Sequence, residues 1–249
     1  MQEKISTVVH EFKSISLEEM NTVALMKRTD TKYVIPFSLL KKILSEVVDD
    51  YSVLEIDDKR IMNYSSVYFD TEDYKFYNDH HNGKTNRTKI RQRKYVDSDL
   101  TFLEKKKKNG KGETNKSRIK IDDFDLKLSQ NAKDFIKNKT KQDVNLTPTL
   151  WNNFYRVTLV SLKNKERVTI DLDLNYTIDN EEKSYKKLVV VEVKQEKFDR
   201  SSAIVKALKK HHNNPYSISK YCIGMVNLYD NLKSNLFKRK LLKINKISA

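Results

Sequence analysis

The sequence has few of the residues that mark several common classes of protein. It contains one cysteine, Cys222, among 249 residues, which excludes an internal disulfide framework and a cysteine-based zinc site. Four glycines and three prolines exclude collagen-like, proline-rich and flexible-linker proteins, as well as a glycine-rich dinucleotide-binding fold. Residues 1–21 lack a signal-peptide pattern, and no apolar run approaches the roughly 20 residues of a membrane span. We therefore expect a soluble, cytoplasmic protein.

Positive charge is what the sequence has in excess. There are 49 Lys and Arg against 34 Asp and Glu, a formal net charge of +15. Aromatic residues make up 10%, including 13 Tyr, which distinguishes the chain from a disordered polyelectrolyte. Such an excess of charge calls for an anionic partner, which could be nucleic acid, anionic lipid or a polyanionic small molecule.

The hydrophobic pattern predicts mostly antiparallel strands with helices between them and no repeat or linker. Strands are expected at 24–35, 64–69, 84–95, 100–108, 117–121, 151–162, 166–174 and 188–194. Helices are expected at 36–48, 71–81, 201–211, 219–228 and 232–244, with one or two short ones within 122–141. Eight strands close readily into a barrel, so the predicted fold class is α+β, an eight-stranded antiparallel β-barrel with surrounding helices.

Charged residues recur on one face of these strands, because successive side chains of a strand point to opposite faces. Lys89, Arg91 and Arg93 share a face, and Glu192 and Lys194 share another. The same mixture appears in three further sets: Arg28, Asp30 and Lys32; Glu104 and Lys106; and Arg167, Thr169 and Asp171. On a single strand this would indicate a solvated outer face. Its repetition on five or six strands favours a barrel whose charged faces converge on a lumen.

A lumen lined with charges restricts what can occupy it. Unpaired charges there would be costly, so it must hold counter-charge and water. Arginines bind phosphate oxygens bidentately and lysines act as mobile point charges, which suits a phosphate chain. Carboxylates among them suit a divalent metal that bridges phosphate oxygens.

A series of motifs spans roughly residues 24–228: Arg28-Thr-Asp30-Thr-Lys32-Tyr33-Val, Ser66-Val-Tyr68-Phe-Asp70-Thr, Lys89-Ile-Arg91-Gln-Arg93, Leu103-Glu104-Lys-Lys106, Tyr155-Arg156, Arg167-Val-Thr169-Ile-Asp171, Glu192-Val-Lys194 and Ser219-Lys220-Tyr221. In this order the motifs resemble those of the triphosphate tunnel metalloenzymes. Within that superfamily the sequence is most similar to the VTC domain, the polyphosphate polymerase catalytic domain of the vacuolar transporter chaperone complex and its bacterial relatives.

The resemblance implies an eight-stranded tunnel that transfers the γ-phosphate of ATP onto a growing polyphosphate chain with Mn²⁺ or Mg²⁺. The catalytic, phosphate-binding residues that it implies are Lys32, Arg91, Arg93, Lys106, Arg156, Arg167, Lys194 and Lys220. Further substrate contacts would come from Lys89, Tyr155, Ser219 and one of Lys116 and Arg118. Glu192 would be the metal ligand.

One motif departs from the pattern of most tunnel enzymes. Where they carry glutamates in Glu-x-Glu-x-Lys, this sequence has Arg28-Thr-Asp30-Thr-Lys32, which matches the VTC branch and weakens a simple triphosphatase interpretation. The alternatives are a metal-dependent inorganic or nucleoside triphosphatase and a non-catalytic polyphosphate- or nucleotide-binding module. Nucleic acid is not expected as a partner, because the basic residues are spread over many strands and no recognition motif appears.

The chain is expected to form a single domain over 1–249, with a core at about 24–228. A basic amphipathic helix at about 229–247 would pack on this core, and contact with an anionic membrane surface or a membrane partner stays open. We expect no internal membrane segment. The pairs His80-His81 and His211-His212 are expected to be exposed rather than to bind metal, because adjacent residues point apart on a helix.

Overall fold

The computed structural model describes residues 2–23, 28–110 and 114–248. Its strands are β1 (Lys13–Ile15), β2 (Thr29–Pro36), β3 (Ser52–Leu54), β4 (Met62–Asp70), β5 (Arg87–Tyr95), β6 (Leu100–Lys108), β7 (Thr114–Ile121), β8 (Thr147–Ser161), β9 (Glu166–Ile178), β10 (Glu181–Tyr185) and β11 (Leu188–Gln195). Its helices are α1 (Gln2–Glu11), α2 (Leu17–Asn21), α3 (Phe37–Ser45), α4 (Lys75–His81), α5 (Gln130–Thr140), α6 (Ala203–Lys210), α7 (Lys220–Leu228) and α8 (Lys238–Ser248).

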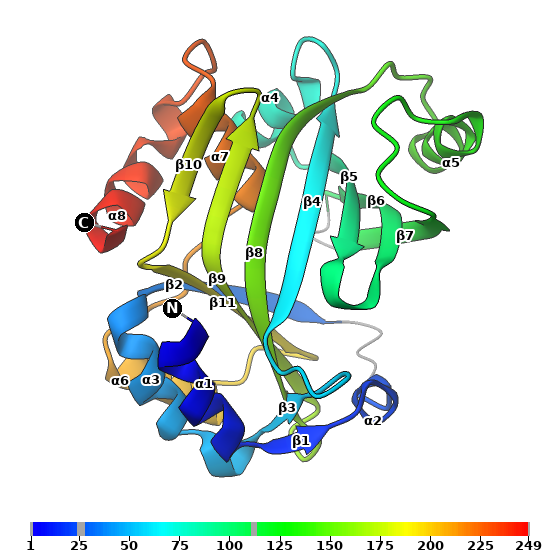
Figure 1. The fold of residues 1–249 in the computed structure, drawn as a ribbon. Helices are drawn as coiled ribbons and strands as arrows, with labels where there is room; N and C mark the ends of the chain where they lie inside the picture. The colour runs from blue at the N-terminus through cyan, green and yellow to red at the C-terminus, as the bar shows by residue number, and fades with distance from the viewer. Residues whose placement is uncertain (1, 24–27, 111–113, 249) are drawn as a thin grey trace.

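Eight strands follow one another in a curved antiparallel path, β2-β11-β9-β8-β4-β5-β6-β7 (Figure 1). β10 extends the sheet beside β9, β3 pairs with β8, and β1 pairs in parallel with β3. Irregularities at Tyr68/Phe69 and Asn153/Tyr155 interrupt the register of β4 and β8, and bulges of this kind bend a strand. The predicted α+β fold with eight antiparallel strands is confirmed. In the described residues the end strands β2 and β7 are not paired with each other, so hydrogen bonds do not close the sheet.

The outer face of β2, β8, β9 and β11 is apolar and packs under helices. Residues such as Val168, Ile170 and Val191 are fully buried in a core that includes α1, α3 and α6. Figure 1 shows these three helices grouped at the same end of the molecule. Because side chains alternate along a strand, the neighbours Arg167, Thr169 and Glu192 must point to the concave face.

Part of the concave face is apolar and is covered by α7 and α8. Side chains of α7, including Ile223 and Met225, share a buried cluster with Leu150 and Tyr176 of the sheet. A Cβ atom on Gly224 would lie 2.4 Å from a Leu150 side-chain carbon, so only glycine permits this approach of helix and sheet. α7 therefore fills one part of the concave face and leaves the charged part open.

Several element boundaries differ from those predicted. Residues 24–27 of the first expected strand lie outside the described residues, and β2 begins at Thr29. α4 begins at Lys75 rather than at 71, because the Asp70 side chain accepts hydrogen bonds from the backbone of Thr71, Phe76 and Tyr77 and so arranges the preceding turn. β7, β8 and β9 are longer than predicted, and the sequence pattern did not predict α1, α2, β1 or β10.

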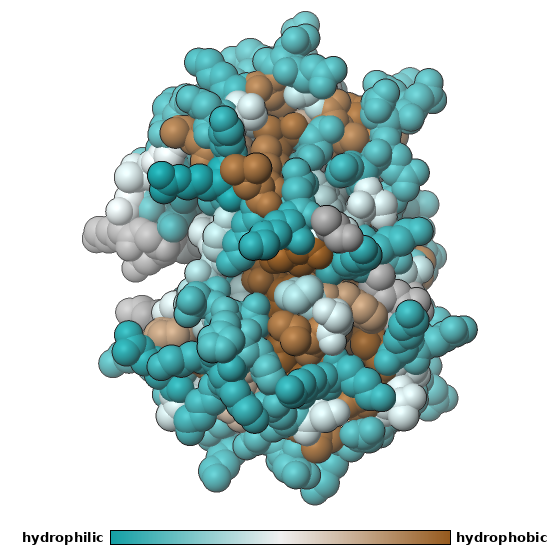
Figure 2. Space-filling view, turned by 90° about the vertical axis from the view of Figure 1, so that its left-hand side faces the viewer, coloured by the Kyte–Doolittle hydropathy of each residue, from teal (hydrophilic) through white to brown (hydrophobic). Residues whose placement is uncertain are grey.

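The C-terminal region packs through one side of α8. Ile244 is fully buried beside the α7 cluster, whereas Leu236 and Leu242 are 60% and 62% exposed. Figure 2, which faces the side that carries α8, shows apolar side chains gathered in a narrow band between hydrophilic surfaces. In the described part of the chain, no helix is long and apolar enough to cross a membrane.

The expected exposure of the histidine pairs was wrong for three of the four residues. His81 is buried and its ring packs edge-on against Phe237. His80 is partly buried, and His211 bonds Glu46 at 2.8 Å. The segment preceding α8 covers α4, a contact between parts of the chain that local spacing does not reveal.

Candidate active site

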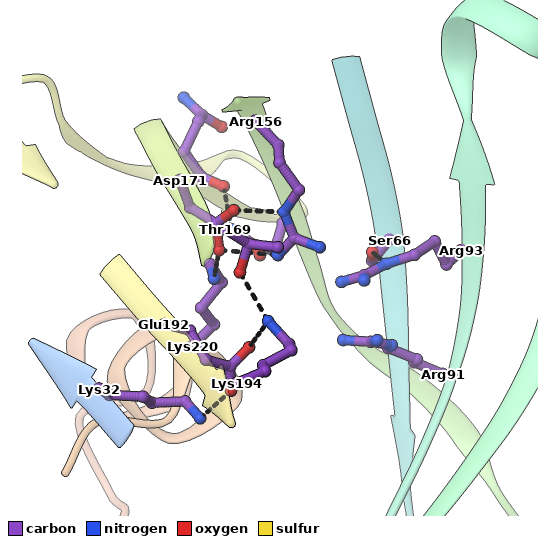
Figure 3. Close-up of polar contacts among 12 residues, drawn as sticks. Lys32, Ser66, Arg91, Arg93, Arg156, Thr169, Asp171, Glu192, Lys194 and Lys220 are labelled. Atoms are coloured by element: carbon purple, nitrogen blue, oxygen red, sulfur yellow. Dashed lines mark hydrogen bonds and ion pairs between the residues drawn. The ribbon is translucent and has the colours of Figure 1, made fainter. Parts of the chain in front are cut away.

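Ten basic side chains converge on the open part of the concave face, on two walls that oppose each other. Figure 3 shows Arg91 and Arg93 of one wall facing Lys194 and Arg156 of the other. We call the first the β5–β7 wall; it carries Lys89, Arg91, Arg93, Lys106 and Lys116. We call the second the β9–β11 wall, which includes residues of β2, β8 and α7; it carries Lys32, Arg156, Arg167, Lys194 and Lys220. Glu192 and Lys32 of the second wall act electrostatically on Lys106 of the first. Charges on the two walls therefore interact with each other across the space between them.

Glu192 joins two lysines on the β9–β11 wall. It accepts a hydrogen bond from the Lys32 ammonium, and its other oxygen lies 2.8 Å from Lys194 Nζ. Lys194 also donates to Thr169 Oγ1 at 2.8 Å. Burial alone would raise the pKa of Glu192, but the two lysines hold this pKa well below its usual range. Burial lowers the pKa of Lys194 to about 8, against the opposing effect of Glu192.

A second carboxylate on the same wall connects the sheet to α7. Asp171 receives two bonds from Arg156, Nε to Oδ1 at 2.5 Å and Nη2 to Oδ2 at 2.9 Å. Lys220, the first residue of α7, donates to the same carboxylate. Burial would raise the pKa of Asp171, but Arg156 and Lys220 lower it below the ordinary range. The carboxylate is thus ionised, and it holds both cations in place.

On the β5–β7 wall, Glu104 holds two of the five cations. Arg91 binds one of its oxygens with Nε at 2.8 Å and Nη2 at 2.7 Å, and Lys116 Nζ lies 2.5 Å from the other. Arg91 also donates to the Tyr68 hydroxyl at 3.3 Å. Burial lowers the pKa of Lys116 to about 8, although Glu104 opposes this shift. Glu104 therefore organises this wall as Asp171 organises the other.

The remaining cations of the site have no carboxylate partner among the described residues. Arg93 donates to Ser66 Oγ at 3.1 Å, and its guanidinium lies 5.4 Å from the centre of the Phe154 ring. Lys89 donates to Ser219 Oγ at 2.7 Å. The side chains of Lys106 and Arg167 form neither a hydrogen bond nor an ion pair within the described ranges. Burial, followed by the charge of nearby Arg91, lowers the pKa of Arg93, as expected for a cation short of counter-charge.

The structure brings together all eight residues expected to be catalytic, along with Lys89, Ser219 and Glu192. It excludes Tyr155, which packs against the outer core because it lies on the opposite face of β8 from Arg156. Phe154 lies beside the cations in its place. Between the two alternatives on β7, Lys116 reaches Glu104, whereas the guanidinium of Arg118 lies 4.5 Å from the centre of the Phe102 ring.

Two carboxylates of the site were left out of the set derived from the sequence. Glu104 and Asp171 each neutralise two buried or half-buried cations, so they determine where those cations point. Strand alternation already placed Glu104 with Lys106 and Asp171 with Arg167, which was the available signal. Alternation could not show that Glu104 pairs with Arg91 or Asp171 with Arg156, because each arginine lies on a neighbouring strand and alternation relates residues of one strand only.

Comparison with known proteins agrees with this geometry. The VTC domain model matches residues 27–229. The chain belongs to the VTC domain family. No match was found among curated proteins.

Two solved structures show the same fold as this VTC domain. A candidate adenylyl cyclase from Hippeastrum, described as having a dominant triphosphatase activity, shares 12% identity over 81% of this chain and 96% of its own, with a TM-score of 0.53. A candidate adenylate cyclase from Bacillus halodurans shares 12% identity over 78% of this chain and 96% of its own, with a TM-score of 0.50. The fold is that of the triphosphate tunnel proteins.

The tunnel carboxylates limit how the VTC domain could hold a metal ion. In the described residues no three His, Cys, Asp or Glu side chains gather as a ready-made metal site. Glu104, Asp171 and Glu192 each contact two basic groups. Mg²⁺-like ions are commonly held by one or two carboxylates together with substrate phosphates and water. A single tunnel carboxylate is therefore sufficient for a metal ion that enters the site already bound to the phosphates of the substrate.

Proposed function

We propose that this VTC domain is an ATP-dependent polyphosphate polymerase, which transfers the γ-phosphate of ATP to the end of a polyphosphate chain in the tunnel. The observation that carries the proposal is the imbalance of charge in the site, where ten basic side chains face Glu104, Asp171 and Glu192, and the Arg28–Asp30 ion pair beside them adds no net charge. A polyanion with densely spaced charges compensates such an excess, and arginines and lysines around one space can bind it from several directions.

Phosphoryl transfer depends mostly on positioning and on neutralising charge, and the site offers both. Arg91, Arg93, Arg156 and Arg167 would hold the triphosphate, with Lys32, Lys106, Lys194 and Lys220 around it. A terminal oxygen of the acceptor chain attacks the γ-phosphorus, the bond to the β–γ bridging oxygen breaks, and ADP leaves with that electron pair. The attacking oxygen is already ionised, so the step needs no general base.

Glu192 is the residue that we propose to hold Mn²⁺ or Mg²⁺. The ion would neutralise charge on the bound phosphate oxygens. Glu192 suits this role because its carboxylate is ionised and 16% exposed on the tunnel side. Lys32 and Lys194 keep it in position, and they would approach the same phosphates that the ion contacts.

Incubation of the protein with ATP and Mn²⁺, followed by analysis of chain length and free phosphate, tests the proposal. Growth of chains with release of ADP is expected. Release of phosphate without chain growth would identify a triphosphatase instead, and binding without turnover would identify a non-catalytic module.

Arg91→Ala and Lys194→Ala should each abolish chain growth in folded protein, and full activity in both would refute the assignment. Lys107→Ala, on the opposite face of β6, is the matched control.

Two further measurements test the metal and the class of ligand. Glu192→Gln should remove the dependence on Mn²⁺, and unchanged activation by the ion would exclude Glu192 as its ligand. Tripolyphosphate should compete with ATP far better than DNA of equal charge, because the cations face one another across the concave face of the sheet and do not form a surface stripe. ATP as the donor implies a cytoplasmic reaction. Contact of α8 with an anionic membrane is a separate property, which vesicle binding would test.

A further inference from the structure

The row of cations on β5 continues past the space between the two walls. Arg87, Lys89, Arg91 and Arg93 occupy alternate positions, so all four point to the same face. Six residues of strand separate Arg87 from Arg93, which is about 20 Å at 3.4 Å per residue. Three phosphate groups in a row cannot span this length. Arg87 lies four residues, about 14 Å along the strand, from Arg91, so a triphosphate held between Arg91 and Arg93 does not extend to it.

Basic residues from two other elements gather around Arg87. Lys108 of β6 pairs with it in the register of the sheet, two positions from the Lys89–Lys106 pair and on the same face. Lys240 of α8 is close enough for Arg87 to act on it electrostatically, and its ammonium lies 5.6 Å from the centre of the Phe237 ring. We call Arg87, Lys108 and Lys240 the outer cluster. Two strands of the tunnel and a helix from the other end of the chain thus supply cations to one place.

The outer cluster adjoins the tunnel at Lys89, which lies two residues from Arg87 on the same face of β5, and the electrostatics of His80 agree with this placement. Burial lowers the pKa of His80 to about 2, with further lowering by the charges of Lys89, Arg87, Lys240 and Lys108 in that order. Lys89 in turn acts on Lys106 and Lys32 inside the tunnel. Lys89 is therefore the residue of the β5–β7 wall that lies next to the outer cluster.

The outer cluster has no counter-charge in the described part of the chain. Neither Arg87, Lys108 nor Lys240 forms an ion pair there. Asp79, next to His80 in sequence, is already bound by Lys75 at 2.6 Å and Lys84 at 2.7 Å. Lys108 is exposed, and Arg87 and Lys240 are partly exposed. In contrast to the tunnel, where carboxylates hold six of the ten cations, this cluster is open to an external anion.

We propose that the outer cluster is a subsite for the phosphates of a chain longer than a triphosphate, as it passes the end of the tunnel near α4 and α8. This inference rests on the proposed function, because it assumes that phosphates bind between the walls. Arg87 and Lys108 lie in line with Arg91 and Lys106 on their strands, so a chain held in the tunnel is directed toward them. Lys240 makes α8 a contributor to chain binding.

The test compares a short and a long phosphate chain. We would measure binding of tripolyphosphate and of a polyphosphate several times longer to the wild-type protein and to the combined variant Arg87→Gln/Lys108→Gln/Lys240→Gln. The wild type should prefer the longer chain by about tenfold or more, since each added phosphate contact releases counterions. The variant should lose this preference and keep its affinity for tripolyphosphate within about twofold. Its slope of log K against log salt for the long chain should fall by about 2 for three lost contacts.

A control variant separates local contacts from net charge. Lys127→Gln/Lys133→Gln/Lys163→Gln removes the same three charges from exposed positions outside the tunnel. It should retain the preference for the long chain, and loss of the preference in this control would show an effect of net charge alone. A wild-type protein that fails to bind tripolyphosphate would refute the proposed function itself.

Two outcomes would overturn the inference and leave the proposed function intact. The first is tripolyphosphate binding with an unchanged long-chain preference in the outer-cluster variant. The second is an outer-cluster variant that keeps the chain-length preference but no longer binds vesicles that contain phosphatidylserine, to which the wild type binds. That result would assign the three cations to lipid headgroups.

Discussion

The two walls of the tunnel neutralise their charge differently. On the β9–β11 wall, two carboxylates hold four of the five cations, leaving Arg167. On the β5–β7 wall, one carboxylate holds two of five, leaving Lys89, Arg93 and Lys106 without an acid in the described residues. A paired cation is already positioned before a ligand arrives, whereas an unpaired one gains its counter-charge from the ligand. The first wall is thus preorganised, and the second depends more on the phosphates.

The largest effect is expected from removing a carboxylate of the paired wall. Asp171→Asn would leave Arg156 and Lys220 close together without their shared anion. Loss of one partner from a buried ion pair costs about 3–5 kcal/mol in the free energy of unfolding. Urea denaturation should show this loss, and saturating tripolyphosphate should restore part of it by supplying negative charge. A loss below about 1 kcal/mol would contradict the view that this carboxylate holds the wall together.

Removing an unpaired cation should lower the affinity for ligand more than the stability of the fold. Arg93→Met should weaken tripolyphosphate binding by about 30-fold or more, corresponding to about 2 kcal/mol for a lost buried charge contact. The free energy of unfolding without ligand should change by less than about 1 kcal/mol, because an apolar group of similar size replaces a buried, uncompensated cation. Calorimetric titration and denaturation of the same variant measure both quantities. Equal losses of stability and affinity would remove the distinction between the walls.

One lysine on each wall should make ligand binding sensitive to pH. The pKa values of Lys116 and Lys194 are each lowered to about 8, chiefly by burial. A phosphate ligand favours the protonated amines, so binding should take up protons near pH 8, and affinity should fall between pH 7 and 9. Calorimetric titration at pH 8 in two buffers of different ionisation enthalpy detects the uptake. Lys116→Arg/Lys194→Arg should abolish it, because arginine stays charged.

The same two lysines have a second effect, on the stability of the free protein. Because their pKa values in the folded protein lie below the unfolded value of 10.5, the unfolded chain binds more protons between about pH 8 and 10.5. Their contribution to stability therefore rises with pH in that range, while ligand affinity falls. Denaturation curves of the wild type and the double arginine variant would separate this contribution from those of other groups.

The smallest expected effect compares neighbouring lysines on β6. Lys106→Ala should weaken tripolyphosphate binding by about tenfold, or about 1.4 kcal/mol, because Lys106 faces the opposite wall. Lys107→Ala, one position away, should change it by less than about twofold, because the Lys107 side chain points to the opposite face of β6, away from the bound phosphates. Equal effects of the two variants would mean that net charge, not position on the strand, governs binding.

Most of the tunnel-facing residues could be predicted from the sequence, because the alternation of side chains along a strand is a local property. Lys89, Arg91 and Arg93 had to share a face whatever the rest of the chain did. The pairing of Lys32 with Glu192 joins residues 160 positions apart, so it depends on β2 lying next to β11. Tyr155 was misassigned because its neighbour Arg156 carried the motif, although adjacent strand residues point to opposite faces.

The sequence by itself determined the excess of positive charge, the period-two pattern that gathers it on one face, and membership of the VTC domain family. Only the tertiary structure decided which cations are neutralised. Glu104 and Asp171 meet their arginines across neighbouring strands, and the order and curvature of the sheet set those distances. The same holds for α7, which Gly224 allows to lie directly on Leu150, and for the outer cluster, where α8 brings Lys240 to strands more than 130 residues earlier in the chain.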